Sequence, residues 1–108
     1  MEDTALMHEI RLLIDELPAV PAARVEHTLT DGYARALALE AQRSRLRRSI
    51  GELAARAAPD PVGRTRELSL LSEQLAVAED ALERLRALLS LLRARAGTAG
   101  TGVASAHA

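Results

Sequence analysis

The amino-acid sequence predicts an all-α fold: a long antiparallel helical hairpin with a short N-terminal helix folded back to make a partial three-helix bundle. Apolar residues recur at alternating steps of three and four along two long stretches, which is the spacing of one face of a helix. The segment Pro59-Asp60-Pro61 separates these stretches, and a residue before proline is pushed out of the helical region. The single expected domain covers residues 1–96, with helices at about 4–17, 22–57 and 62–96.

The composition favours layers of helices over an enclosed cavity. Apolar residues make up 48% of the 108, yet Tyr33 is the only aromatic residue and there is no cysteine. Aromatic side chains supply much of a pocket wall, so a chain rich in Leu and Ala indicates helix-on-helix packing. Fourteen basic residues, all arginine, against fifteen acidic ones give a net charge of −1, which disfavours a general polyanion binder.

The first predicted helix is amphipathic and short. Thr4 suits its N-cap, and the acidic residues before Thr4 lie on the favourable side of the helix dipole. Its apolar stripe consists of Leu6, Met7, Ile10, Leu13, Ile14 and Leu17. Pro18 ends the helix and Pro21 suits the first position of the next one. Because the link is so short, we expect the first helix to fold back antiparallel on the second.

The two long helices carry heptads that match in one antiparallel register. The facing pairs run from Ala57 with Arg64 to Val25 with Ala96, and they include Gly32 with Leu89 and Arg43 with Ala78. Beside this seam, four flanking pairs have opposite charge: Glu26–Arg93, Glu40–Arg86, Arg47–Glu79 and Arg56–Glu67. Such agreement is what an antiparallel coiled coil requires. After this hairpin, residues 97–108 are mainly Gly, Ala, Thr and Ser with little apolar bulk, so we expect a disordered tail.

A second apolar stripe on the third helix is the candidate protein-interaction surface. Its members are Leu70, Val77, Ala81, Leu88 and Leu91. The first helix is about 20 Å long at ~1.5 Å per residue, so it can reach Leu88 and Leu91 but not Leu70 and Val77. Exposed aliphatic side chains of this kind are typical of an interaction surface. Self-association of the distal halves explains them most simply, so we expect a homodimer.

Small residues near the open end of the hairpin are expected to serve helix packing. A glycine inside a helix costs about 1 kcal/mol relative to alanine, so Gly32 needs a reason. Together with Ala36 it would admit the first helix into a three-helix bundle. The alternative is a kink or a partner groove at residues 31–33. Tyr33 is expected to pack against the first helix with its hydroxyl at the surface.

The densest basic run suggests an alternative function, contact with nucleic acid or another anion. It comprises Arg43, Arg45, Arg47 and Arg48. These side chains point in several directions around the helix, and no aromatic residue is interleaved with them. Arg47 is also expected to pair with Glu79. We therefore interpret the run as a solvated, salt-bridged face, and nucleic acid is not the expected partner.

Chemistry of other kinds has little support in the sequence. His8, His27 and Asp31 could supply three metal ligands, but a hydrogen-bonded polar patch is the preferred interpretation and no metal is expected. No Ser-His-Asp array, glycine-rich phosphate loop or paired carboxylate in a cleft appears, so we predict no catalytic residue, no cofactor and no enzyme. The acidic start at Glu2 and Asp3 is unlike a signal peptide, and no apolar run approaches the ~18 residues of a membrane span. A cytoplasmic location is the expectation.

One stretch also carries a resemblance. Residues 28–40, Thr-Leu-Thr-Asp-Gly-Tyr-Ala-Arg-Ala-Leu-Ala-Leu-Glu, resemble segments of small uncharacterised helical proteins from high-GC Gram-positive bacteria. The resemblance covers the second helix and part of the third, and it implies no activity. In size the chain is similar to WXG100-type secreted hairpins, but their Trp-x-Gly turn is absent, since residues 58–63 read Ala-Pro-Asp-Pro-Val-Gly. The sequence thus predicts a non-enzymatic interaction module, a scaffold or adaptor, that binds itself, another protein or both.

Overall fold

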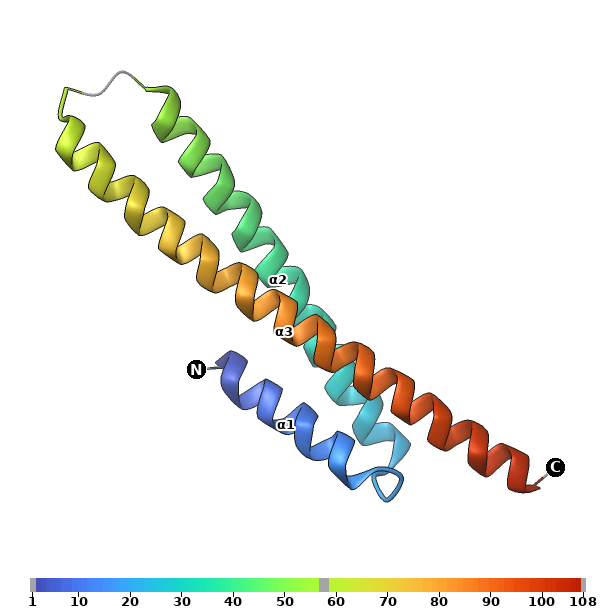
Figure 1. Ribbon diagram of the computed structural model, residues 1–108. Helices are drawn as coiled ribbons and strands as arrows, with labels where there is room; N and C mark the ends of the chain where they lie inside the picture. The colour runs from blue at the N-terminus through green and yellow to red at the C-terminus, as the bar shows by residue number, and fades with distance from the viewer. Residues whose placement is uncertain (1, 57–58, 108) are drawn as a thin grey trace. The chain divides into compact units, whose positions relative to one another are not determined.

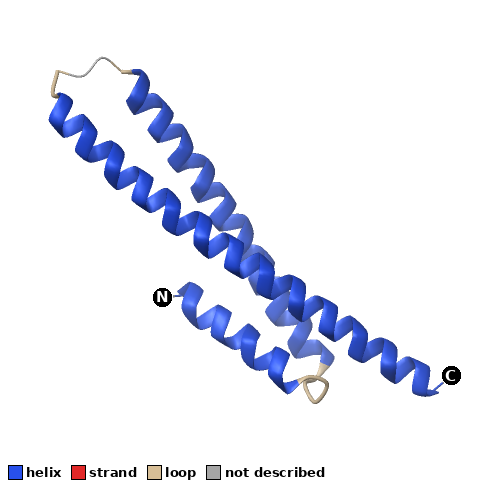
Figure 2. Ribbon diagram, in the orientation of Figure 1, coloured by secondary structure: helices blue, strands red, loops and turns tan. Residues whose placement is uncertain are grey.

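A computed structural model describes residues 2–56 and 59–107 of the chain, with side chains described for residues 3–56 and 59–98. Three α-helices account for most of these residues: α1 (Glu2–Glu16), α2 (Ala22–Ala55) and α3 (Pro61–His107) (Figures 1 and 2). No strand occurs in the described part of the chain. Helices α2 and α3 run antiparallel and pack together, and α1 contacts α3, which confirms the predicted all-α class.

Packing divides the chain into two compact units, where the sequence predicts one domain. Unit 1 comprises Met1–Ala36 and Glu83–Ala108, and unit 2 comprises Leu37–Leu82. Unit 1 therefore contains α1, the beginning of α2 and the later part of α3. Unit 2 contains only α2, α3 and the turn that joins them, because α1 is too short to extend into it.

Unit 1 is a three-helix bundle with a fully buried aliphatic core. Its buried apolar side chains are Met7, Ile10, Leu13 and Ile14 of α1, Val25 and Ala36 of α2, and Leu85, Leu89 and Leu92 of α3. These positions belong to the predicted stripe of the first helix and to the predicted seam. Thr28 is buried among them. Each large aliphatic side chain so buried contributes roughly 1.5–3 kcal/mol, which makes the three-helix packing the main source of stability here.

Gly32 is buried at a close approach of α2 to α3. A Cβ added at this position would lie 2.3 Å from Leu89 Cδ2, and the three nearest atoms all belong to Leu89. The predicted facing of Gly32 with Leu89 is therefore confirmed. The expectation that Gly32 admits the first helix is corrected, since the side chain that fills its space comes from α3.

Unit 2 is a layer of two helices whose seam is only partly buried. Leu39, Ala78 and Leu82 are buried. The remaining seam side chains are half-buried: Leu46, Ile50, Leu53, Leu68, Leu71 and Leu75. Two helices cannot surround their shared seam, so each of these side chains keeps one side toward solvent. An ion pair of 3.2 Å between Arg47 Nη2 and Glu79 Oε2 confirms one predicted flanking pair and the antiparallel register.

The turn of unit 2 caps both helices that it joins. The Asp60 carboxylate accepts the Gly63 backbone N–H at 3.1 Å, the contact of an N-cap residue with the third residue of its helix. Pro61 occupies the first position of α3, where its missing N–H costs nothing. The Arg64 guanidinium donates to the Arg56 carbonyl oxygen at 2.6 Å, placing a positive charge at the C-terminal end of α2.

Helix boundaries agree with the sequence to within about two residues at most ends, the usual uncertainty of such boundaries. Helix α1 begins at Glu2, so Thr4 lies inside its first turn and is not the N-cap. The Pro21 carbonyl accepts the N–H groups of Arg24 and Val25, so Pro21 immediately precedes α2. The predicted last residue of the second helix, Ala57, lies outside the described residues.

The largest difference from the sequence prediction concerns residues 97–107. A disordered tail is predicted there, whereas α3 continues to His107. Gly97 does not adopt the positive φ of a helix-ending glycine, so the chain has no such signal at this position. Extension of an existing helix adds one hydrogen bond per residue without a new nucleation cost, and alanine is the best helix former.

Candidate functional site

The predicted interaction stripe lies on the outer face of α3. In unit 2, Leu70 is 53% exposed, Val77 is 70% exposed and Ala81 is half-buried. In unit 1, Leu88 is half-buried and Leu91 is 40% exposed, so α1 leaves Leu91 only partly covered. Residues seven or eleven apart lie on one face of a helix, which aligns Leu70, Val77 and Ala81.

The stripe of unit 2 lies on a defined flank of the seam. The Arg47–Glu79 ion pair marks one flank, since both residues follow a seam position directly. Leu70 and Val77 each lie directly before one seam position and two residues after another. This spacing places both side chains toward the other flank. On α2 the corresponding positions of that second flank are occupied by Arg45 and Glu52, both exposed. The sequence interpretation did not include Glu52, because a lone carboxylate on a polar helix face gives no signal.

A comparison of the two units shows what the stripe of unit 2 lacks. In unit 1, where α1 packs on the hairpin, the α3 seam side chains Leu85, Leu89 and Leu92 are 0–2% exposed. In unit 2 the seam side chains Leu71 and Leu75 remain half-buried, and the described residues of that unit include no third helix. Unit 2 therefore presents two kinds of accessible aliphatic side chain: the exposed residues of the stripe and the half-buried residues of the seam. A surface of this kind favours contact with another apolar helix face.

The basic run on α2 is divided among different surroundings. Arg43 lies in the seam, half-buried, with its Nε atom buried and without a hydrogen-bond partner. Arg47 is paired with Glu79. Arg45 and Arg48 are exposed, but they point away from the helix about 60° from each other, at ~100° of turn per residue. The sequence interpretation expected these four arginines to point in several directions. In the structure they likewise do not form one cationic surface.

The three predicted packing residues have different surroundings. Gly32 and Ala36 are buried in unit 1. Tyr33 is 41% exposed, so the expectation that it packs against the first helix is wrong. Helix α1 instead lies over the flank of α2 that carries Thr28 and Arg35, the flank opposite to Tyr33. Gly32 under Leu89 leaves no groove at residues 31–33.

The contact that holds the N-terminal end of α1 is an ion pair that the sequence interpretation missed. The Arg35 guanidinium donates from Nε and Nη2 to the two carboxylate oxygens of Asp3, with the Nη2–Oδ2 distance at 3.1 Å. These hydrogen bonds lower the pKa of Asp3 from 3.8, although partial burial opposes the shift. A signal did exist, since an antiparallel fold-back through the Pro18–Pro21 link places position 3 close to position 35.

The candidate metal ligands do not form a site. His27 Nε2 lies 3.4 Å from Asp31 Oδ2, one helical turn away, and both side chains are exposed. Within the described part of the chain, no cluster of three histidine, cysteine or carboxylate side chains is placed to hold a metal ion. Nor is any described helix both long enough and apolar enough to span a bilayer.

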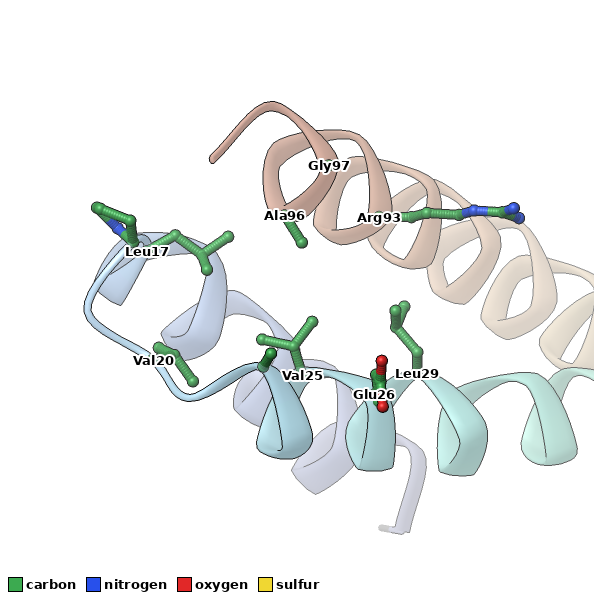
Figure 3. A pocket seen from close by; sticks show the side chains of 10 residues that line it. Leu17, Val20, Val25, Glu26, Leu29, Arg93, Ala96 and Gly97 are labelled. Atoms are coloured by element: carbon green, nitrogen blue, oxygen red, sulfur yellow. The ribbon is translucent and has the colours of Figure 1, made fainter. Parts of the chain in front are cut away.

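Unit 1 also contains an apolar pocket of about 480 Å³ where the α1–α2 link meets α3 (Figure 3). Val25 and Leu29 point toward α3, where the small residues Ala96 and Gly97 help to leave the space open. Glu26 and Arg93 line the pocket and, although predicted to pair, form no ion pair among the described residues. Their opposite charges select neither an anion nor a cation, so the pocket has no chemistry that would define a ligand.

Comparison with known proteins adds no assignment. The chain matches no protein-family model, no curated protein and no solved structure.

Proposed function

We propose that the protein is a non-enzymatic interaction module, a scaffold or adaptor. Its partner, another copy of the chain or another protein, presents an apolar helix face to the α3 stripe of unit 2. The observation that carries this proposal is the exposure of Leu70 and Val77, at 53% and 70%, above a seam that is itself only half-buried. A cytoplasmic, bacterial setting is part of the proposal, and the resemblance of residues 28–40 supports the bacterial source.

Unit 1 supports this proposal because it shows what a third helix does to the same kind of seam. Its α3 seam leucines, Leu85, Leu89 and Leu92, are almost completely buried beneath α1. A partner helix on unit 2 would bury the seam side chains Leu71 and Leu75 in the same way, and as the partner of the stripe it would also contact Leu70 and Val77. Full burial of a large aliphatic side chain is worth roughly 1.5–3 kcal/mol, so the exposed fractions of these two residues represent roughly 2–4 kcal/mol. That is enough to favour association once further contacts are added.

The anion-binding alternative makes a different prediction about salt. Contacts to phosphates weaken steeply as ionic strength rises, because counterions are released on binding. Burial of aliphatic side chains does not weaken in this way. Binding that persists at about 1 M NaCl, where electrostatic screening is nearly complete, supports the aliphatic stripe and opposes the arginine run.

Site-specific photo-crosslinking in the cells that make the protein tests the proposal. A photoreactive amino acid replaces Val77 in one variant and Ser72, an exposed α3 residue on the other flank, in the control. We expect a covalent adduct of discrete mass from position 77 and none from position 72. Adding Leu70→Glu should abolish the adduct, whereas adding Leu37→Glu should not, because Leu37 is an exposed leucine of α2 away from the stripe. Equal adducts at both positions, or none, would contradict the proposal.

A further inference from the structure

The stripe-bearing flank of unit 2 has a pattern that repeats on both of its helices. On α3, Leu70 and Val77 stand seven residues apart, and on α2, Arg45 and Glu52 stand seven residues apart. The spacing is about 10.5 Å on each helix, at ~1.5 Å per residue. In the antiparallel register, Arg45 lies level with Val77, and Glu52 lies level with Leu70. The flank therefore has one apolar and one charged residue at each of two levels, and the two charges are opposite.

This pattern distinguishes between the two ways in which a second copy can face the first. A two-fold axis parallel to the helices would place α2 of the partner over α3. Leu70 would then face a carboxylate and Val77 a guanidinium, which costs free energy because charges lose water against apolar groups. A two-fold axis perpendicular to the helices places α3 on α3 and α2 on α2, with the levels exchanged. Leu70 then faces Val77 of the partner subunit, and Arg45 faces Glu52 of the partner subunit.

We propose that the partner of this surface is a second copy of the chain, docked antiparallel through unit 2 about a two-fold axis perpendicular to α2 and α3. This inference rests on the proposed function and specifies its partner and geometry. A surface that is its own complement in both hydrophobicity and charge is the requirement of an isologous dimer. The surface meets it at both levels. An unrelated partner would place no constraint on the order of Arg45 and Glu52 along α2.

Charge reversal in the full-length protein tests the geometry, with the dimer dissociation constant measured by sedimentation equilibrium. Arg45→Glu alone and Glu52→Arg alone each create two like-charge contacts across the antiparallel interface. Each should raise the dissociation constant about tenfold, since each exposed charge contact is modest. The double variant Arg45→Glu with Glu52→Arg restores both contacts. An equimolar mixture of the two single variants should form a mixed dimer as tight as the parent.

Arg48→Glu is the matched control, because it makes the same charge change at an exposed α2 position outside this flank. Its dissociation constant should stay within about twofold of the parent. Far-ultraviolet circular dichroism of each variant confirms that the helices are intact. Single variants that weaken the dimer without rescue in the mixture would overturn the antiparallel geometry.

The outcomes separate this inference from the proposed function. A chain that stays monomeric at every concentration, yet crosslinks at position 77 to a protein of another mass, overturns the second-copy partner and leaves the interaction module in place. A chain that dimerises with unchanged affinity in both single variants overturns the geometry alone. No crosslink at position 77 and no dimer would overturn both.

Discussion

Replacing Gly51 of α2 by alanine should stabilise the protein, whereas the same replacement of Gly32 should not. Alanine is about 1 kcal/mol better than glycine inside a helix. At Gly51 an added Cβ meets no atom within 4 Å, so Gly51→Ala should stabilise the protein by about that amount. At Gly32 the added Cβ would meet Leu89 Cδ2 at 2.3 Å, Cγ at 3.2 Å and Cδ1 at 3.3 Å. The same substitution must therefore displace the whole end of that side chain.

The size of the penalty follows from where Leu89 lies. It is 2% exposed within the core of unit 1, so it cannot swing into solvent. Overpacking of a well-packed core typically costs 1–3 kcal/mol. After the gain of about 1 kcal/mol in helix propensity, Gly32→Ala should range from neutral to about 2 kcal/mol destabilising. Relative to Gly51→Ala it should be worse by roughly 1–3 kcal/mol.

Urea unfolding followed by circular dichroism measures both variants against the parent. Leu89→Ala provides a further check, since alone it should cost about 2–5 kcal/mol. Combined with Gly32→Ala it should cost less than the sum of the two, by roughly 0.5–3 kcal/mol, because the clash is removed. If Gly32→Ala stabilises as much as Gly51→Ala, the close approach of α2 and α3 at this point is refuted.

Two further predictions concern the ends of the helices. Asp3→Asn should destabilise by roughly 1–3 kcal/mol at neutral pH, because it removes the charged partner of Arg35. The pKa of Asp3 in the folded protein lies below 3.8. The difference in unfolding free energy between parent and variant should therefore be complete above about pH 5, and it should shrink as the pH falls through the folded pKa. A difference that persists unchanged at pH 2 would argue against the ion pair. Gly63→Ala would bring a Cβ to 2.3 Å from Asp60 Oδ2 and so disturb the N-cap hydrogen bond of α3. Like Asp60→Ala, it should lower stability by about 1 kcal/mol. Unchanged thermal unfolding of either variant would show that this cap contributes nothing.

The register of the hairpin is predictable from sequence because it depends on periodicity alone. Once Leu53 is set opposite Leu68, each step along one helix fixes a step along the other. Gly32 then meets Leu89, as the structure confirms. The pairing of Arg47 with Glu79 follows from the same register. A slip of one heptad would separate both pairs, so these contacts are strongly specified.

The flank on which α1 lies is not predictable in the same way. The five-residue link, residues 17–21, allows the first helix to pack on either flank of the hairpin, and the apolar stripe of α1 fits both. The sequence interpretation placed Tyr33 beneath α1, whereas the structure buries Thr28 there and leaves Tyr33 exposed. The bidentate contact between Asp3 and Arg35 belongs to the flank that α1 occupies. The charge pair of Asp3 and Arg35 is therefore a better indication of the flank that α1 occupies than the lone aromatic residue Tyr33.

The candidate surface was predictable as an exposed stripe but not as a patterned one. Leu70 and Val77 stand outside the heptad seam, so their exposure follows from the hairpin register. The relation between Arg45 and Glu52 becomes visible only when unit 2 is considered as a flank with two helices side by side. Low apolar content predicts disorder after Gly97, but α3 continues there because a helix that is already formed extends at little cost.

Disulfide crosslinking tests the central claim most directly, because the chain contains no cysteine of its own. Leu70→Cys and Val77→Cys are prepared separately, mixed in equal amounts and oxidised, and the linked positions are identified by mass spectrometry. Antiparallel docking brings position 70 of one copy to position 77 of the other, within the ~4–7 Å between Cα atoms that a disulfide spans. The mixture should therefore yield a disulfide joining positions 70 and 77, in excess over either variant alone. Absence of covalent dimer, or links predominantly between identical positions, would contradict the docking of unit 2 on itself.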